Sequence, residues 1–470
     1  MTAHRLLAGL GGPLLFLCAG YGVLAILGVP WRIRGARRAA LAYLAGVAGV
    51  SMALWVLSHV LWVPLRRASI LSVILSFALI GAVDAVRRLR PAAARALHST
   101  RSLAASAAFV FAAIVCAGCL ADALTRPILD WDGQMTWDPA ARWVRSERTV
   151  DAKVMSEARW YVTHPQYPLL LPLAQVAVEE VFDTEEDGRV VRPLYSLFLP
   201  AYLVLLYFGA RRLGATRPGA ALMSAAAAAI PILTYHLAGG AVTTYGDFPL
   251  AAFWGAAVLL LLEARRTLAR AAGFFLGAGL LTKNEGLPLA LIALAVFAWP
   301  AVRRVARLLR RSRRLDLQPL RPAARTAVPV LLCAALLFSW RAEIPNRWDE
   351  VYTLAPLSEL PAKLVKRIPP AIPAIGAEML DKESWRDFWW VALVAFLAGA
   401  RTGRTRRLRP AALALAGCVV LYLLAYATTP WLGNALVHPT WNRFVVQLSI
   451  PLFAILATRL DPSGRLTASR

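Results

Sequence analysis

Long runs of apolar residues constrain this chain more than any other feature of its sequence. They recur from residue 6 to residue 459, and short polar segments rich in arginine separate them. A run of about 20 apolar residues can cross the hydrocarbon core of a membrane as a helix. In addition, 59% of the residues are hydrophobic and only 17% are charged, whereas soluble domains have about 45–50% and about 25%. The sequence therefore predicts an all-α, polytopic integral membrane protein.

The apolar runs predict about 13 transmembrane helices. These predicted helices cover residues 6–29, 39–64, 68–86, 103–124, 193–210, 219–237, 248–264, 270–282, 286–302, 325–341, 388–401, 410–430 and 444–459. The first run exceeds the apolar core of about 7–15 residues that a signal peptide has, so we expect it to be retained.

The positions of lysine and arginine predict the orientation of the chain. Cytoplasmic loops carry an excess of these residues. Basic clusters at residues 32–38, 303–314 and 401–409 follow alternate predicted spans, with few acidic residues beside them. This pattern places them in the cytoplasm, with the N-terminus outside and the C-terminus inside. The net charge of +25 then reflects orientation in a cell (inner or plasma) membrane, and we expect no nucleic-acid partner.

Two of the predicted extracytoplasmic segments are long, residues 125–192 and 342–387. Within the first, residues 167–182 are apolar but contain two prolines and a pair of glutamates. They are also shorter than the roughly 20 residues of a span. We therefore expect a helix that lies along the outer membrane surface.

This organisation predicts three parts of the chain. They are an N-terminal three-helix extension (residues 1–102), a membrane core that includes the first long outer segment (residues 103–302), and C-terminal membrane helices that include the second (residues 303–470).

The first outer segment carries three carboxylates close to a membrane span, at Asp130, Asp132 and Asp138. Asp138 precedes Pro139, a pair that is typical of a helix start, so we expect Asp138 to cap a helix over residues 139–149. Asp130 and Asp132 precede that helix. From their spacing alone they are either catalytic carboxylates or solvated loop acids.

Charged residues also occur at three other outer helix ends. Asp247 begins a predicted span, Lys283 and Glu285 lie between two short apolar helices, and Arg443 opens the last span. Charges at membrane depth are costly and commonly functional. Each also has a structural explanation. Asp247 would be stabilised by the helix N-terminus beside it, and Lys283 and Glu285 could form an ion pair. Arg443 could extend its side chain so that the charged end lies at the membrane interface.

Histidines give a weaker signal. His164, close to Tyr167 in the first outer segment, could contact a phosphate or act as a base, although a single loop histidine more often does neither. His59, His236 and His438 are isolated in the sequence. We therefore predict no metal site from the sequence.

Taken in order along the chain, these motifs resemble those of the GT-C superfamily of polytopic glycosyltransferases, which includes protein O-mannosyltransferases and aminoarabinose transferases. The matching residues are Trp131, Asp132 and Trp137, then residues 164–172, 245–249 and 281–286, with a weaker match at Arg443. Two departures are Ala140, where related loops often have a basic residue, and the three spans that precede the matching core.

The resemblance implies a GT-C-like fold with juxtamembrane helices in the first long outer loop. It also implies that a sugar moves from a polyprenyl-phosphate donor to an acceptor hydroxyl on the extracytoplasmic side, with inversion. Asp132 is then the first choice of base and Asp130 the second. The implied substrate-binding residues are Asp247, Lys283, Glu285, Arg443, His164 and Tyr167, of which Lys283 and Arg443 would meet the lipid phosphate.

The donor sugar stays open, as do the acceptor (lipid, glycan or protein) and the involvement of a divalent metal. Two other classes of protein are alternatives. A lipid or glycan flippase would show internal symmetry and ionisable residues in mid-span, neither of which the sequence has. A non-catalytic membrane scaffold with the same fold is the third possibility.

Overall fold

The computed structural model describes residues 3–88, 102–184, 188–236, 239–263, 265–312, 317–344, 358–399, 405–428 and 433–459. The regular structure of these residues is entirely helical, as the sequence predicts, and no β-strand occurs among them. The α-helices are α1 (Ala3–Ile26), α2 (Gly35–Trp55), α3 (Arg67–Arg88), α4 (Leu103–Thr125), α5 (Asp138–Glu147), α6 (Leu170–Phe182), α7 (Gly188–Ser196), α8 (Phe198–Leu213), α9 (Arg217–Ala229), α10 (Asp247–Leu262), α11 (Ala269–Thr282), α12 (Gly286–Ser312), α13 (Arg321–Ala342), α14 (Leu360–Met379), α15 (Phe388–Gly399), α16 (Thr405–Thr428) and α17 (Gly433–Ala457).

Short helical turns occur between these helices. Two of them are π-helical, η1 (Val56–Val60) at the end of α2 and η2 (Gly133–Trp137) in the first outer loop. Single π-helical turns are uncommon and frequently occur at functional sites.

Nine helical segments in the described residues are long and apolar enough to cross a membrane. They are Ala3–Ile26, Gly35–Val60, Arg67–Arg88, Leu103–Thr125, Gly188–Leu213, Gly286–Arg310, Gln318–Ala342, Leu408–Thr428 and Leu436–Ala457. The other four predicted spans coincide with α9, α10, α11 and α15, which have 13, 16, 14 and 12 residues. The fold is therefore that of a polytopic membrane protein. The predicted count of about 13 spans is not confirmed, because these four helices are shorter than the roughly 20 residues of a straight crossing.

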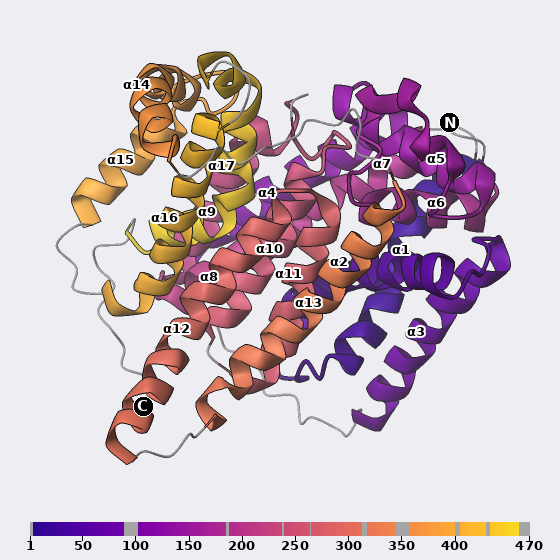
Figure 1. The fold of residues 1–470 in the computed structure, drawn as a ribbon, viewed down its shortest axis with the longest axis horizontal. Coiled ribbons are helices and arrows are strands. Elements are labelled where there is room, and N and C mark those ends of the chain that lie inside the picture. Colours follow the sequence, from indigo (N-terminus) through magenta and orange to yellow (C-terminus); the bar gives the residue numbers. More distant parts are fainter. Residues whose placement is uncertain are drawn as a thin grey trace.

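Helix ends that the sequence assigns to one side of the membrane lie together. In Figure 1 the helices of the two predicted outer segments, α5, α6 and α14, lie at the top, whereas the last turns of α3 and α12 lie at the bottom. At the predicted cytoplasmic ends, Arg37 of α2 forms an ion pair with Glu263, which follows α10. The structure thus groups the helix ends as the predicted orientation requires.

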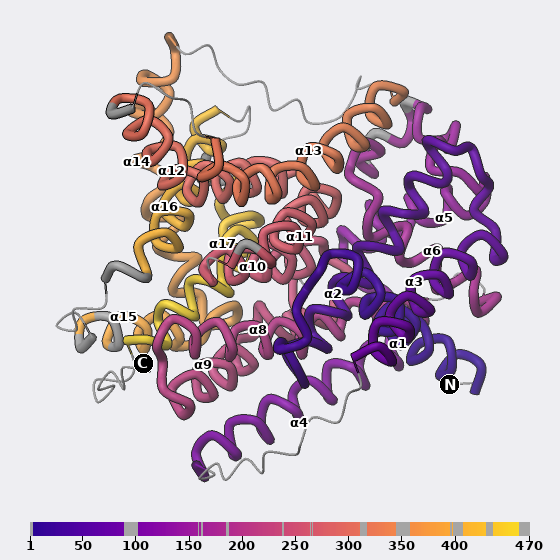
Figure 2. Tube along the Cα trace, turned by 90° about the horizontal axis from the view of Figure 1, so that it is seen from below, coloured from indigo at the N-terminus to yellow at the C-terminus, as the bar shows by residue number. Residues whose placement is uncertain are grey.

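The first three helices and two of the C-terminal helices lie on opposite sides of the molecule. Figure 2 shows α1, α2 and α3 on one side and α15 and α16 on the other, with α8, α10 and α11 between them. The last helix, α17, contacts α8, α10, α14 and α16. It therefore reaches the middle of the bundle although it comes from the end of the chain.

Small residues allow α1 and α2 to pack closely. A Cβ atom on Gly20 would lie 1.7 Å from the carbonyl oxygen of Ala42, and one on Gly46 would lie 1.7 Å from that of Phe16. Small residues at membrane helix interfaces let two backbones approach each other in this way. The N-terminal extension therefore begins with a helix pair that has no room for larger side chains at these positions.

The predicted outer surface helix is α6, and it is more enclosed than the sequence suggested. Leu169, Leu170 and Leu173 are all buried, and α6 contacts α1, α2, α5 and α7. These leucines therefore face neighbouring helices. Glu179 is also buried, and Glu180 accepts a hydrogen bond from Arg145 at 2.9 Å.

The prediction that Asp138 caps the following helix is wrong. The helix already includes Asp138 as its first residue, and no side chain caps its N-terminus. Asp138 instead forms an ion pair of 2.8 Å with Arg142, one helical turn later. An acidic residue in the first turn stabilises a helix through the helix dipole, so its role is still structural.

Candidate functional site

A completely buried carboxylate, that of Asp247, organises the candidate site. It belongs to the first turn of α10, which also contains Pro249. One carboxylate oxygen accepts from Nζ of Lys283 at 2.7 Å and from Nε2 of Gln447 at 2.5 Å. The other accepts from Nε of Arg443 at 2.8 Å. The break after α11 and helix α17 therefore converge on one acidic side chain of α10.

Lys283 reaches Asp247 from the break between α11 and α12. The backbone is extended at Lys283, and its Nζ also lies 3.1 Å from a carboxylate oxygen of Glu285. The break is tight, because a Cβ on Gly286 would lie 2.0 Å from the carbonyl oxygen of Gly279. The structural ion pair considered for Lys283 and Glu285 is thus present, and Lys283 contacts Asp247 as well.

Arg443 connects Asp247 to the first outer loop. Its Nη2 lies 2.8 Å from Oδ2 of Asp247 and 2.5 Å from Oδ2 of Asp132. The guanidinium group also lies over the ring of Tyr245, 4.5 Å from its centre, a cation–π contact. Arg443 is therefore held in one orientation between two carboxylates and an aromatic ring.

Gln447 and Tyr422 complete the buried side of the cluster, and sequence reasoning did not identify either. Tyr422 of α16 donates to Oε1 of Gln447 at 2.6 Å. Its ring stacks on Phe444 with a centre-to-centre distance of 4.0 Å. Gln447 follows Arg443 by four residues, a spacing that puts both on one helix face. That spacing, in an otherwise apolar span, was the available signal.

The five charged groups of this cluster do not balance. Asp132, Asp247 and Glu285 carry three negative charges, whereas Lys283 and Arg443 carry two positive ones. Asp247 is 0% exposed and Lys283 3%, so their charges are stabilised by each other and by hydrogen bonds rather than by water. Asp132 retains an 18% exposed side chain, which leaves it the more accessible of the two carboxylates that Arg443 contacts.

Asp130 lies close to this cluster, but its hydrogen bonds hold the first outer loop in place. Its carboxylate accepts from the backbone N–H of Gly133 at 2.9 Å and from the hydroxyl and backbone N–H of Thr244 at 2.8 and 3.1 Å. Burial raises the pKa of the Asp130 carboxyl, against the opposing effect of these hydrogen bonds. Asp130 therefore fastens the first outer loop to the segment that precedes Asp247.

Tyr167 lies beside Trp137 of the first outer loop, and His164 lies beside Tyr167. The Tyr167 ring packs edge-on against Trp137 at 5.6 Å and against His164 at 5.1 Å. Trp137 in turn lies against Gly246, because a Cβ there would be 2.8 Å from its ring. The structure thus brings Tyr167 toward the cluster through Trp137.

The same loop is tied to the Lys283 region by α13. Arg341, near the end of α13, donates from Nε to the carbonyl oxygen of Gln166 at 2.9 Å and from Nη2 to the side chain of Asn284. Asn284 lies between Lys283 and Glu285. Arg341 therefore links the first outer loop to the break between α11 and α12.

The second outer segment, which matched no known motif, docks beside Arg443. Asn442 of α17 donates to Glu378 of α14 at 2.6 Å and accepts from Nε1 of Trp385 at 2.7 Å. His438, one turn earlier, also pairs with Glu378. The residue next to Arg443 thus anchors α14, a contact that no sequence spacing indicated.

Two cavities accompany these contacts. The larger, about 690 Å³, lies at the opposite end of the bundle, where Arg212, Glu263 and Arg265 line it together with apolar residues. A smaller one of about 250 Å³ lies beside Asp130 and Arg192. The charged cluster around Asp247 is therefore separate from this cavity of about 690 Å³.

No known protein family, no curated protein and no solved structure matches this chain.

Proposed function

We propose that this protein is a GT-C-type membrane glycosyltransferase. In the proposed reaction a sugar moves from a polyprenyl-phosphate donor to an acceptor hydroxyl on the extracytoplasmic side, with inversion. The observation that carries the proposal is the position of Arg443, which bridges a loop carboxylate, Asp132, and a buried one, Asp247. A base and cations that can face a phosphate are thereby adjacent.

Each residue has a defined part in this reaction. The acceptor oxygen attacks the anomeric carbon, the bond from that carbon to the phosphate oxygen breaks, and the hydroxyl proton passes to Asp132. The departing lipid phosphate is neutralised by Arg443 and Lys283. Charges held in place before reaction stabilise such a developing anion without reorganisation.

The contacts of the two loop acids favour Asp132 as the base. Asp130 is only 4% exposed, and its carboxylate accepts three hydrogen bonds from Gly133 and Thr244. Asp132 is more exposed and contacts Arg443. A general base must be within hydrogen-bond reach of the proton that it accepts, and Asp132 meets that requirement better.

Asp247 has a supporting part in the proposal. It touches both cations, Lys283 and Arg443, and its burial keeps it away from bulk water. It would hold the two cations beside each other. Glu285, with a 23% exposed side chain, would position the sugar or the acceptor.

Lipid analysis of cells tests the proposal. Cells that lack the protein should accumulate a polyprenyl-phosphate sugar, and the wild-type protein and Asp138→Asn should remove it. Asp132→Asn should not, because loss of a general base lowers the rate by about 10²–10⁴-fold. Asp138→Asn is the matched control, since it lies in the same loop and its partner Arg142 is 46% exposed.

A second assay separates the three classes of protein. Purified protein with a synthetic polyprenyl-phosphate sugar should release polyprenyl phosphate when an acceptor is present. A flippase would move labelled donor across vesicles without breaking the sugar–phosphate bond, and a scaffold would do neither. Normal transfer by Asp132→Asn would refute the mechanism.

A further inference from the structure

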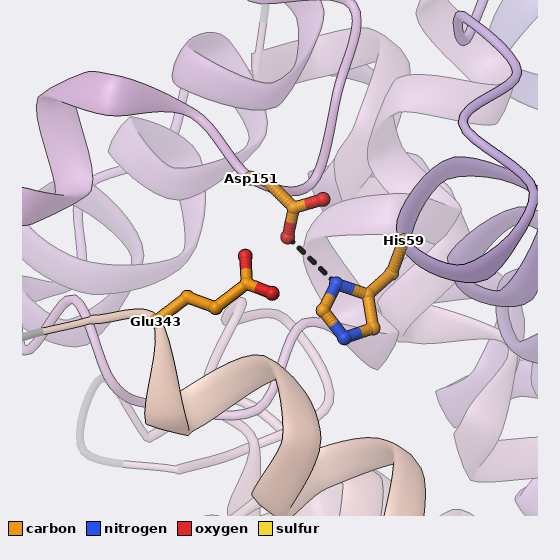
Figure 3. A group of neighbouring side chains, drawn as sticks. All are labelled: His59, Asp151 and Glu343. Atoms are coloured by element: carbon orange, nitrogen blue, oxygen red, sulfur yellow. Dashed lines mark hydrogen bonds and ion pairs between the residues drawn. The ribbon is translucent and has the colours of Figure 1, made fainter.

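A second group of polar side chains lies outside the cluster around Asp247. It consists of His59 in η1, Asp151 after α5 and Glu343 directly after α13, and their nearest ligand atoms all lie within 4.8 Å of one another. Figure 3 shows that the two carboxylates and the imidazole ring point toward one another. Sequence reasoning treated His59 as isolated, because its neighbours come from distant parts of the chain.

The backbone around this group is held in place on all three sides. Ser58 accepts from the backbone N–H of Val150 at 3.0 Å. Nε1 of Trp340 donates to the carbonyl oxygen of Val150 at 2.9 Å, and Trp340 packs edge-on against Trp55 at 5.3 Å. The residues next to His59, Asp151 and Glu343 are therefore fixed relative to one another.

Two side chains lie at the imidazole ring of His59. Nδ1 lies 2.9 Å from Oδ1 of Asp151. Nε2 lies 3.2 Å from the hydroxyl oxygen of Ser339, which also contacts the carbonyl oxygen of Leu336 at 3.0 Å. In the tautomer that carries its proton on Nε2, the lone pair of Nδ1 faces Asp151, so the two side chains can ligate one cation.

The second carboxylate oxygen of Asp151 is the observation that points to a bound cation. Oδ2 of Asp151 is buried and has no hydrogen-bond partner among the residues that the structure describes. An unpaired buried carboxylate oxygen is costly. A cation bound between Asp151 and His59 would satisfy it.

We propose that His59, Asp151 and Glu343 bind a divalent transition-metal ion, with Zn²⁺ as the best match. Zn²⁺ takes histidine nitrogen and carboxylate oxygen at about 2.0–2.2 Å. A ligating histidine commonly donates its other N–H to a neighbouring acceptor, and the hydroxyl oxygen of Ser339 lies at that distance, 3.2 Å from Nε2. The exposed Glu343 side chain can close the remaining gap by rotating.

The bound ion would join three parts of the chain at their outer ends. His59 belongs to the N-terminal extension, Asp151 to the first outer loop and Glu343 to the start of the second outer segment. This inference does not depend on the proposed function, because no residue of the Asp247 cluster takes part in it.

Metal analysis of the full chain tests the site. The protein, purified without a histidine tag, is stripped with a chelator and then equilibrated with Zn²⁺. The wild type should retain one Zn²⁺ per chain, measured by mass spectrometry of the metal. Glu343→Gln keeps the contact between His59 and Asp151 and changes an exposed residue, so it should fold normally and weaken Zn²⁺ binding by about tenfold or more.

Two further variants complete the test. His59→Ala should abolish Zn²⁺ uptake and the rise in unfolding temperature that Zn²⁺ produces, whereas His4→Ala, a change at an exposed histidine of α1, should preserve both. If stripped wild-type protein takes up no Zn²⁺, the proposal is wrong. Equal uptake by the wild type, Glu343→Gln and His59→Ala would also overturn it.

Discussion

Nη2 of Arg443 donates to Oδ2 of Asp132 at 2.5 Å, although 311 residues separate the two in the sequence. The same guanidinium group contacts the buried carboxylate of Asp247. One side chain from the last helix thus joins the first outer loop to the membrane helices.

This contact predicts that arginine cannot be replaced by lysine at position 443. Lysine keeps the charge but is a single point donor that cannot contact two carboxylates as the guanidinium fork does. Arg443→Lys should therefore fold, with an unfolding temperature close to that of the wild type, but lose most sugar transfer. Arg443→Gln should lose both stability and transfer. Wild-type transfer rates in Arg443→Lys would show that charge alone is sufficient.

Removal of the buried carboxylate should be the most destabilising single change in the cluster. Asp247→Asn leaves Lys283 and Arg443 without their shared partner, and breaking a buried ion pair costs about 3–5 kcal/mol. The measurement is the free energy of unfolding by denaturant titration in micelles. Glu285→Gln is the control and should cost less, because the Glu285 side chain is 23% exposed.

A double variant checks the cause. Lys283 has two carboxylate partners, Asp247 and Glu285, and loses one of them in Asp247→Asn. Adding Lys283→Gln removes this partly compensated buried cation and should recover part of the lost stability. A double variant less stable than Asp247→Asn alone would contradict the charge argument.

The buried position of Asp130 predicts a pH dependence of stability. Its pKa is raised in the folded protein, so the folded state binds this proton more tightly than the unfolded chain, whose aspartates titrate near about 3.9. The free energy of unfolding of the wild type, relative to that of Asp130→Asn, should therefore fall as pH rises from about 4 through the raised pKa. A difference that is constant or increases with pH would contradict this assignment.

The anchor of α14 predicts a local opening. Asn442→Leu removes the donor to Glu378 and the acceptor for Trp385, and each buried polar group left unpaired costs about 1–3 kcal/mol. Limited proteolysis should then cut residues 358–387 faster than in the wild type. The ion pair of Lys363 and Glu359, whose side chains are 34% and 56% exposed, offers a control, because Lys363→Gln should not change the cutting rate.

The grouping of helix ends predicts the labelling pattern of introduced cysteines. Arg159 lies in the first outer loop and Arg304 on α12, and both are exposed. In intact cells a membrane-impermeant thiol reagent should label Arg159→Cys, and it should label Arg304→Cys only after the membrane is permeabilised. Labelling of both residues in intact cells would refute the predicted orientation.

Several features of the site could be predicted because their signals are local. Apolar runs and arginine clusters determine where helices lie and which ends share a side, and these ends carry Asp132, Asp247, Lys283 and Arg443. The structure brings these four side chains into direct contact. Each was conspicuous as a charge next to an apolar run.

The remaining features depend on contacts between distant helices. Spacing alone did not distinguish Asp130 from Asp132, because burial of Asp130 depends on Thr244, 114 residues later. The pairing of Glu378 with Asn442, and of His59 with Asp151, likewise depends on how helices pack. Glutamate and histidine at these positions have no neighbouring residue in the sequence that reveals their partners.

The position of Arg443 on the last helix has a consequence for the synthesis of the protein. During translation Asp247 is followed by Lys283 after 36 residues, but by Arg443 only after 196. At about 5–20 residues per second, the nascent chain waits roughly 10–40 s between Asp247 and Arg443. From the synthesis of Lys283 until that of Arg443, the carboxylate of Asp247 has Lys283 as its only cation from the cluster. Helix α17 must therefore be synthesised before α10 can reach its final packing.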